Sequence, residues 1–187
     1  PFVDPDEVVL EFGVGPGWNL AAIGCKQRLG YDVADFLEAQ LSARGITFVA
    51  DLHQLPQGSV DTVICHHVLE HLPDPADVLL DIGRLLQPRG KLIVVVPYER
   101  ERRYRHFDPS EPNHHLFSWN VQTLGNLITE MGFRVQRSTL GRYGYDRFLS
   151  VWAVRLGIGA AGFRLLKKIV LAILPLQEVR MMATKMG

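Results

Sequence analysis

The sequence predicts an α/β fold with a Rossmann-like, doubly wound and mostly parallel sheet of seven strands that ends in a C-terminal antiparallel hairpin strand. Short apolar runs alternate with helix-compatible segments as far as Pro97, which is the pattern of strand–helix–strand units in a parallel sheet. Residues 91–96 are almost wholly apolar, as expected of a central strand that is buried on both faces. A short glycine-bearing turn joins the last two predicted strands, and so short a connection favours antiparallel neighbours.

Each element is predicted from an apolar run and the residues that interrupt it. Strands are expected at residues 8–12, 30–33, 46–50, 60–65, 91–96, from 133 onward and at 148–154. Helices are expected at 18–29, at 35–44, within 69–86, at 120–131 and at 157–176. Residues 1–156 are expected to form one domain, and 157–187 a C-terminal amphipathic helical extension.

Composition excludes several classes of function. Lys and Arg number 20, as do Asp and Glu, so no overall field favours nucleic acid and no nucleic-acid partner is expected. Cys25 and Cys65 have no metal-ligand spacing, and two isolated thiols argue for a reducing compartment. A cytoplasmic protein without a metal site is therefore expected.

The stretch that organises the chain is the first strand together with the glycine-rich loop after it. Gly13, Gly15 and Gly17 alternate with other residues directly after this strand, whose penultimate residue is Glu11. Glycine lacks the Cβ atom that would keep a ligand from the backbone, and it tolerates positive φ. Because helix-compatible residues follow, the loop is expected to present N–H groups at a helix N-terminus, as in nucleotide-type binding sites.

Three carboxylates are expected at the carboxyl ends of strands, where open parallel sheets bind their ligands. They are Glu11, Asp32 and Asp51. Asp32 follows Gly13 by 19 residues, the distance at which an acid on the second strand reaches the ribose hydroxyls of a nucleoside.

The glycine spacing argues against a bound pyrophosphate. Trp18 occupies the position of the third glycine in a dinucleotide fingerprint, and the Lys and Ser or Thr of a P-loop are missing. An acid directly before the glycines suits a ligand with an amino group better. These residues favour a phosphate-free nucleoside with a cationic arm, and S-adenosylmethionine is the common ligand of that kind. A dinucleotide-dependent dehydrogenase is the alternative against which Trp18 argues.

The chain resembles the class I S-adenosylmethionine-dependent methyltransferases, especially the branch with small-molecule, quinone-type and sterol-type enzymes. The resemblance covers about residues 8–136, through the stretches VVLEFGVGPG, GYDVAD, VADLHQLP, VDTVICHHVLEHLPDPADVLLDIGRLLQPRGKLIVVVP and HHLFSWNVQTLGNLITEMGFRV. It implies that the cofactor loop is formed by Glu11, Gly13, Gly15 and Gly17. Asp32 would bind the ribose and Val33 would pack on the adenine, whose amino group would meet Asp51, with Leu52 nearby. Cys65 and His66 would border the methionine moiety.

The resemblance also implies a reaction. A small-molecule acceptor would take the methyl group by in-line displacement, and S-adenosylhomocysteine would leave. Catalysis would rest on positioning, with a base if the acceptor is a hydroxyl. The candidate catalytic residues are His66, His67 and His115, whereas His71 is expected to pack in a Glu-His-Leu turn. The alternative is a non-catalytic module that binds S-adenosylmethionine or S-adenosylhomocysteine, or serves assembly, with a degenerate or truncated substrate site.

The amphipathic helix expected at 157–176 is the second unusual feature. Arg164, Lys167 and Lys168 share one face of it, and these cations together with Pro175 argue against a transmembrane span. The favoured expectation is a helix packed on the sheet, over the cofactor, or against a second subunit. Peripheral contact with a membrane is the alternative.

Overall fold

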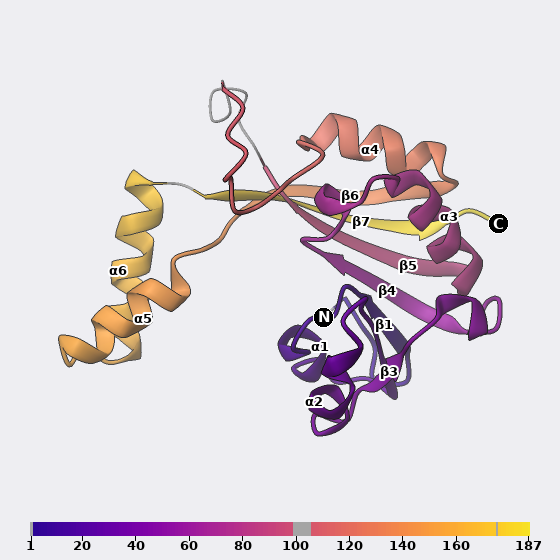
Figure 1. Ribbon diagram of the computed structural model, residues 1–187, viewed down its shortest axis with the longest axis horizontal. Coiled ribbons are helices and arrows are strands. Elements are labelled where there is room, and N and C mark those ends of the chain that lie inside the picture. Colours follow the sequence, from indigo (N-terminus) through magenta and orange to yellow (C-terminus); the bar gives the residue numbers. More distant parts are fainter. Residues whose placement is uncertain (1, 99–105, 175) are drawn as a thin grey trace.

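The computed structural model describes residues 2–98, 106–174 and 176–187. Its centre is a seven-stranded sheet in the order β3-β2-β1-β4-β5-β7-β6 (Figure 1). Strands β1 to β5 pair in parallel, and β7 pairs antiparallel with both β5 and β6. The predicted fold class is confirmed.

The strands are β1 (Val8–Phe12), β2 (Gln27–Tyr31), β3 (Thr47–Val49), β4 (Val60–His66), β5 (Leu86–Pro97), β6 (Phe133–Arg142) and β7 (Gln177–Lys185). The helices are α1 (Trp18–Ala21), α2 (Glu38–Ser42), α3 (Pro75–Leu85), α4 (Val121–Glu130), α5 (Asp146–Arg155) and α6 (Ala160–Ile173), with single 3-10 turns η1 (Asp35–Leu37), η2 (Leu52–Gln54) and η3 (Leu69–His71).

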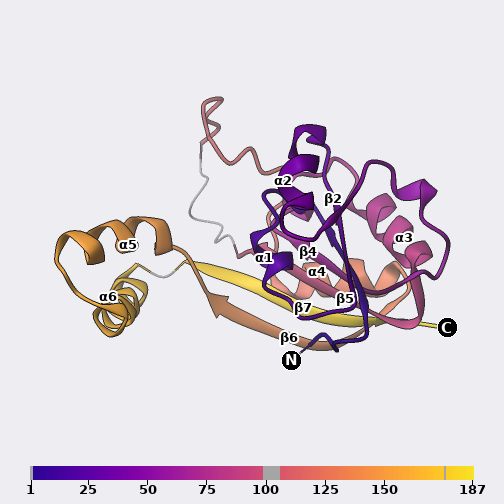
Figure 2. The ribbon, with the colours of Figure 1, turned by 90° about the horizontal axis from the view of Figure 1, so that it is seen from below.

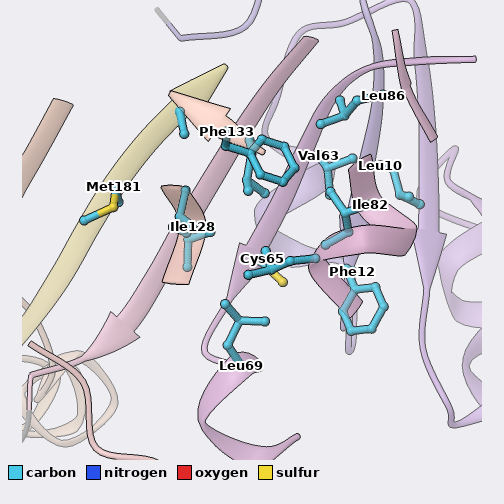
Figure 3. Close-up of a cluster of buried hydrophobic side chains, with 14 of the residues drawn as sticks. Leu10, Phe12, Val63, Cys65, Leu69, Ile82, Leu86, Ile128, Phe133 and Met181 are labelled. Atoms are coloured by element: carbon cyan, nitrogen blue, oxygen red, sulfur yellow. The ribbon is translucent and has the colours of Figure 1, made fainter. Parts of the chain in front are cut away.

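Alternate residues of β1 enter two separate apolar clusters, one on each face of the sheet. Leu10 and Phe12 join the larger cluster, which contains residues of α3 and α4 (Figure 3). Val9 joins the smaller cluster with Leu20 of α1 and Leu41 of α2. Because successive strand residues point to opposite faces, a continuous apolar run is what a strand covered on both sides requires.

The helix expected at 18–29 is much shorter than predicted. α1 ends at Ala21, and Gln27 already pairs with Val8 in the first register position of β2. The Arg28 guanidinium donates to the carbonyls of Leu20 and Ile23, so it satisfies backbone acceptors where the helix stops. Pairing along the full length of β1 therefore outweighs the local helix propensity of residues 22–29.

The strand expected at 148–154 is wrong, because these residues lie in α5. The last strand is β7, in which Val179, Met181 and Ala183 point inward at alternate positions and are almost fully buried. A short apolar run has no period that separates strand from helix, whereas β7 lies in the sheet interior. The segment from residue 157 onward, expected to be a helical extension, also includes a strand of the sheet.

Helices α5 and α6 form a hairpin inserted between β6 and β7 that projects from the sheet (Figures 1 and 2). Leu149 and Ala153 of α5 and Leu171 of α6 are buried. Of the expected positions for this helix, packing on the sheet is wrong, because α6 lies against α5 in both views. None of the helices in the described segments is long and apolar enough to cross a membrane.

Candidate active site

The glycine loop follows β1 and has positive φ at all three glycines. A Cβ atom on Gly13 would lie 2.3 Å from Cγ2 of Val68, so the close approach of the segment after β4 requires glycine there. At Gly15, where φ is +49°, no described atom lies within 4 Å of the position of a Cβ. The loop is therefore packed on one side and open to a ligand on the other.

Asp32 ties this loop to the end of β2. Its carboxylate accepts the N–H of Gly15 at 2.8 Å and the N–H of Ala34 at 3.1 Å. The next side chain, Val33, is 91% exposed. The carboxylate of Asp32 is placed to accept the hydroxyls of a ribose. The exposed apolar side chain of Val33 is suited to pack against an adenine ring.

Glu11 lies at the base of the loop and is almost fully buried. Asn19 Nδ2 lies 3.4 Å from its Oε1, while Oε2 has no hydrogen-bond partner among the residues that the structure describes. Burial raises the pKa of Glu11 to about 7, against a smaller opposing effect of Asn19. A buried acceptor with a free oxygen is suited to the ammonium group of a ligand.

Three of the predicted cofactor residues have side chains engaged elsewhere. Asp51 caps η2 by accepting the N–H of His53 at 2.9 Å. Leu52 and Cys65 are buried in the larger apolar cluster, and Figure 3 shows Cys65 among its neighbours. Burial also raises the pKa of the Cys65 thiol. The Cys65 side chain thus lies in the core, and contact of this strand end with the methionine moiety stays a prediction.

Two histidines end β4 and begin the segment after it. The rings of His66 and His67 stack with centroids 4.5 Å apart, and burial, followed by His67, lowers the pKa of His66. Nε2 of His67 lies 3.2 Å from Oε2 of Glu178 in β7, whose Oε1 accepts from Arg180 at 2.6 Å. Burial alone would raise the pKa of Glu178, but these two bonds hold it below its usual value.

A cavity of about 490 Å³ opens beside these histidines. Its lining includes His67, Glu70 and His71 from the segment after β4, His115 from the loop before α4, and Tyr143 at the base of the hairpin. This segment also carries the valine that packs against the glycine loop, so cavity and loop share one edge of the sheet.

The structure thus brings together two predicted catalytic residues, His67 and His115, while His66 is not among the residues that line the cavity. It adds two acids that the sequence analysis missed. Glu70 lies in the Glu-His-Leu turn, next to His71, and this position is its signal in the sequence. Glu178 has no such signal, because the sequence predicts the last strand at 148–154 and not at β7.

Comparison with known proteins agrees with this geometry. Residues 2–138 match the family model described as a methyltransferase domain. A protein of Mycolicibacterium smegmatis named as a probable S-adenosylmethionine-dependent methyltransferase is 32% identical over 141 residues, which cover 71% of this chain and 54% of that protein. The chain spans about half the length of the curated relatives with this name.

Solved structures show the same fold. An S-adenosylmethionine-dependent methyltransferase of Mesorhizobium loti aligns with a TM-score of 0.63 at 18% identity, over 99% of this chain and 93% of that one. The [4+2]-cyclase SpnF aligns with a TM-score of 0.70 at 20% identity, over 99% and 77%. The family match, the relatives and the fold agree, so this chain belongs to the methyltransferase-domain family, among the class I S-adenosylmethionine-dependent methyltransferases.

Proposed function

We propose that this domain binds S-adenosylmethionine at the glycine loop and that the cavity holds a small-molecule methyl acceptor. The proposal rests on one observation. The cavity with its histidine side chains and the glycine loop lie at the same edge of the sheet, and the buried Glu11 at the base of this loop has one carboxylate oxygen without a described partner. When bound, the cofactor supplies an activated methyl group that an acceptor atom takes by in-line displacement.

The described residues fit this cofactor. The free oxygen of Glu11 would receive its ammonium group, and the backbone at Gly15 leaves room for the ligand. Asp32 already accepts two backbone N–H groups, and its remaining lone pairs would accept the ribose hydroxyls. The exposed side chain of Val33 would cover the adenine, and Asp51 would accept from the adenine amino group.

His67 is the best-placed base for an acceptor with an acidic hydrogen. It lines the cavity, and the contact of its Nε2 with Glu178 at 3.2 Å orients the ring. His115 faces the same cavity and is the second candidate. His66 would act through its stacking on His67, as a positioning residue.

The proposal is tested by calorimetric titration with S-adenosylmethionine, S-adenosylhomocysteine and NAD, followed by a methyl-transfer screen against small hydroxyl and amine acceptors. The domain is expected to bind S-adenosylmethionine and S-adenosylhomocysteine but not NAD. Asp32→Ala should weaken the binding of both nucleosides at least about tenfold. Tight NAD binding would sink the proposal. Binding without transfer to any acceptor would favour the non-catalytic module.

We further propose that the α5–α6 hairpin docks on an anionic membrane surface. Segment 146–174 contains five Lys and Arg but one Asp, in a chain with no net charge. Many large apolar side chains of the hairpin are exposed, namely Phe148, Val151, Trp152, Val154, Leu156, Leu165, Ile169, Ile173 and Leu174. Exposed apolar residues with flanking cations are typical of helices that lie in a bilayer interface with anionic lipids.

The position of the hairpin supports this partner. Its two ends, at Tyr143 and Leu176, line the cavity, so a docked hairpin would hold the cavity mouth near the bilayer. An apolar acceptor dissolved in the membrane would then have a short path to the site. The two free thiols, Cys25 and Cys65, favour the cytoplasmic leaflet, which is also the anionic one.

Sedimentation with phosphatidylcholine vesicles, with and without phosphatidylserine, tests the docking. Binding should require phosphatidylserine, weaken with salt, and fall about tenfold or more when Ile169→Glu and Ile173→Glu are combined. Leu80→Glu, at a 55% exposed position of α3, is the matched control and should bind normally. Vesicle binding that ignores the double variant, or a homodimer that it dissociates, would contradict the membrane as partner.

A further inference from the structure

We propose that Glu70, His71 and His115 bind a divalent transition-metal ion at the wall of the acceptor cavity. Each residue offers one ligand atom, and the three atoms lie within 4.8 Å of one another. All three residues line the cavity. The inference rests on the proposed function only in the use it assigns to the ion, because the site itself is argued from geometry.

The backbone holds these residues together from two separate segments. Glu70 and His71 belong to η3, and the loop before α4 carries His115. The carbonyl of Glu70 accepts the N–H groups of Leu116 at 2.7 Å and Phe117 at 3.2 Å, which fixes the loop on η3. The rings of His71 and His115 consequently meet edge to face, with centroids 4.8 Å apart.

The buried side chain of Glu70 is evidence for the ion that does not depend on the distances between the three residues. It is 1% exposed, and neither of its side-chain oxygens has a hydrogen-bond partner in the described part of the chain. Nε2 of His71 lies 4.0 Å from Oε1, beyond hydrogen-bond distance. A buried carboxylate without partners is unfavourable, and an ion between it and the two imidazoles would give it a partner.

A neighbouring cluster differs in this respect. His66, His67 and Glu178 are also close enough to share an ion. There, however, the carboxylate already bonds to His67 and to Arg180. The unmet ligand capacity lies with Glu70, so the structure assigns the ion to the first cluster.

The ligand set determines the class of metal. Two imidazole nitrogens and one carboxylate oxygen suit Zn²⁺ and its first-row neighbours, whereas Mg²⁺ and Ca²⁺ prefer oxygen ligands. Three protein ligands leave coordination positions for an exogenous oxygen, and the cavity is where such an oxygen would sit. The ion would bind and orient a hydroxyl or carboxylate of the acceptor, and it would lower the pKa of a bound hydroxyl.

Metal binding is measured on the metal-stripped protein with ZnCl₂ alone by calorimetry, and with CoCl₂ by visible absorption, whose intensity reports the coordination. One ion per chain is expected. Glu70→Gln and His115→Ala should each weaken Zn²⁺ binding by more than about tenfold, since even indirect partners of a metal cost that much. His106→Ala, which removes an exposed imidazole, is the matched control and should bind as the wild type.

Two further measurements, of nucleoside binding and of Zn²⁺ binding by another variant, distinguish loss of the metal site from loss of the fold. S-adenosylhomocysteine titration shows whether Glu70→Gln is folded; if that variant fails, His115→Ala in the loop carries the test. The inference is overturned if Zn²⁺ does not bind, or if His67→Ala abolishes binding while Glu70→Gln and His115→Ala do not. Because nucleoside binding and Zn²⁺ binding are separate readouts, loss of one does not mimic loss of the other.

Discussion

Glu11→Gln should remove a pH dependence of stability that the ligand-free protein carries. The pKa of Glu11 is raised from about 4.5 to about 7 by burial. The folded state therefore holds this proton more tightly than the unfolded state, so its stabilising contribution is present at low pH and is lost as pH rises through about 7. At about 1.4 kcal/mol per pKa unit, the full loss is roughly 3 kcal/mol, most of it between pH 5 and pH 8.

The measurement is urea unfolding of wild type and Glu11→Gln without cofactor at several pH values in this range. The free energy of unfolding of the wild type should fall by about 2 to 3 kcal/mol more than that of the variant. Glu38→Gln, on the exposed surface of α2, is the matched control for loss of one carboxylate. Parallel pH profiles for wild type and Glu11→Gln would refute the reasoning, whatever constant difference separates them.

The same group predicts a pH dependence of cofactor binding. If the ligand's ammonium pairs with ionised Glu11, affinity for S-adenosylhomocysteine should rise between pH 6 and pH 8 as the carboxyl loses its proton. Glu11→Gln should bind more weakly and with a flatter pH profile. Titration calorimetry in buffers of different ionisation enthalpy measures both the affinity and the released proton.

Three other outcomes are expected. Gly13→Ala should destabilise the fold by about 2 kcal/mol or more in urea unfolding, because its Cβ would lie 2.3 Å from a valine side chain, whereas Gly15→Ala should mainly weaken nucleoside binding. Glu178→Gln should cost about 1 kcal/mol at pH 7, and this difference should shrink as pH falls below about 4, since the wild-type pKa is lowered; a difference that grew in acid would contradict it. In the native protein the buried thiol of Cys65 should resist an aromatic disulfide reagent that reaches the half-buried Cys25, and equal rates would show that the core opens.

The place of the proposed nucleoside site could be predicted from the sequence because its determinants are local. Glycines at alternate positions after an apolar strand, and acids at strand ends, are visible in a short window of sequence. The structure places Glu11 and Asp32 at the glycine loop. The side chains of Leu52 and Cys65 are buried in the larger apolar cluster, which the sequence does not reveal because the face of the sheet that a side chain enters is set by packing.

The sequence by itself determined the parallel half of the sheet, the glycine loop and the acids beside it, because apolar period, breakers and side-chain charge act over a few residues. Tertiary structure alone decided that β7 lies between β5 and β6, and that the segment before it is a projecting pair of helices. It likewise decided that Glu178 meets His67 and that His115 meets Glu70. The partners in the first contact are separated by 111 positions in the sequence and those in the second by 45, so packing and strand pairing bring them together, not local sequence.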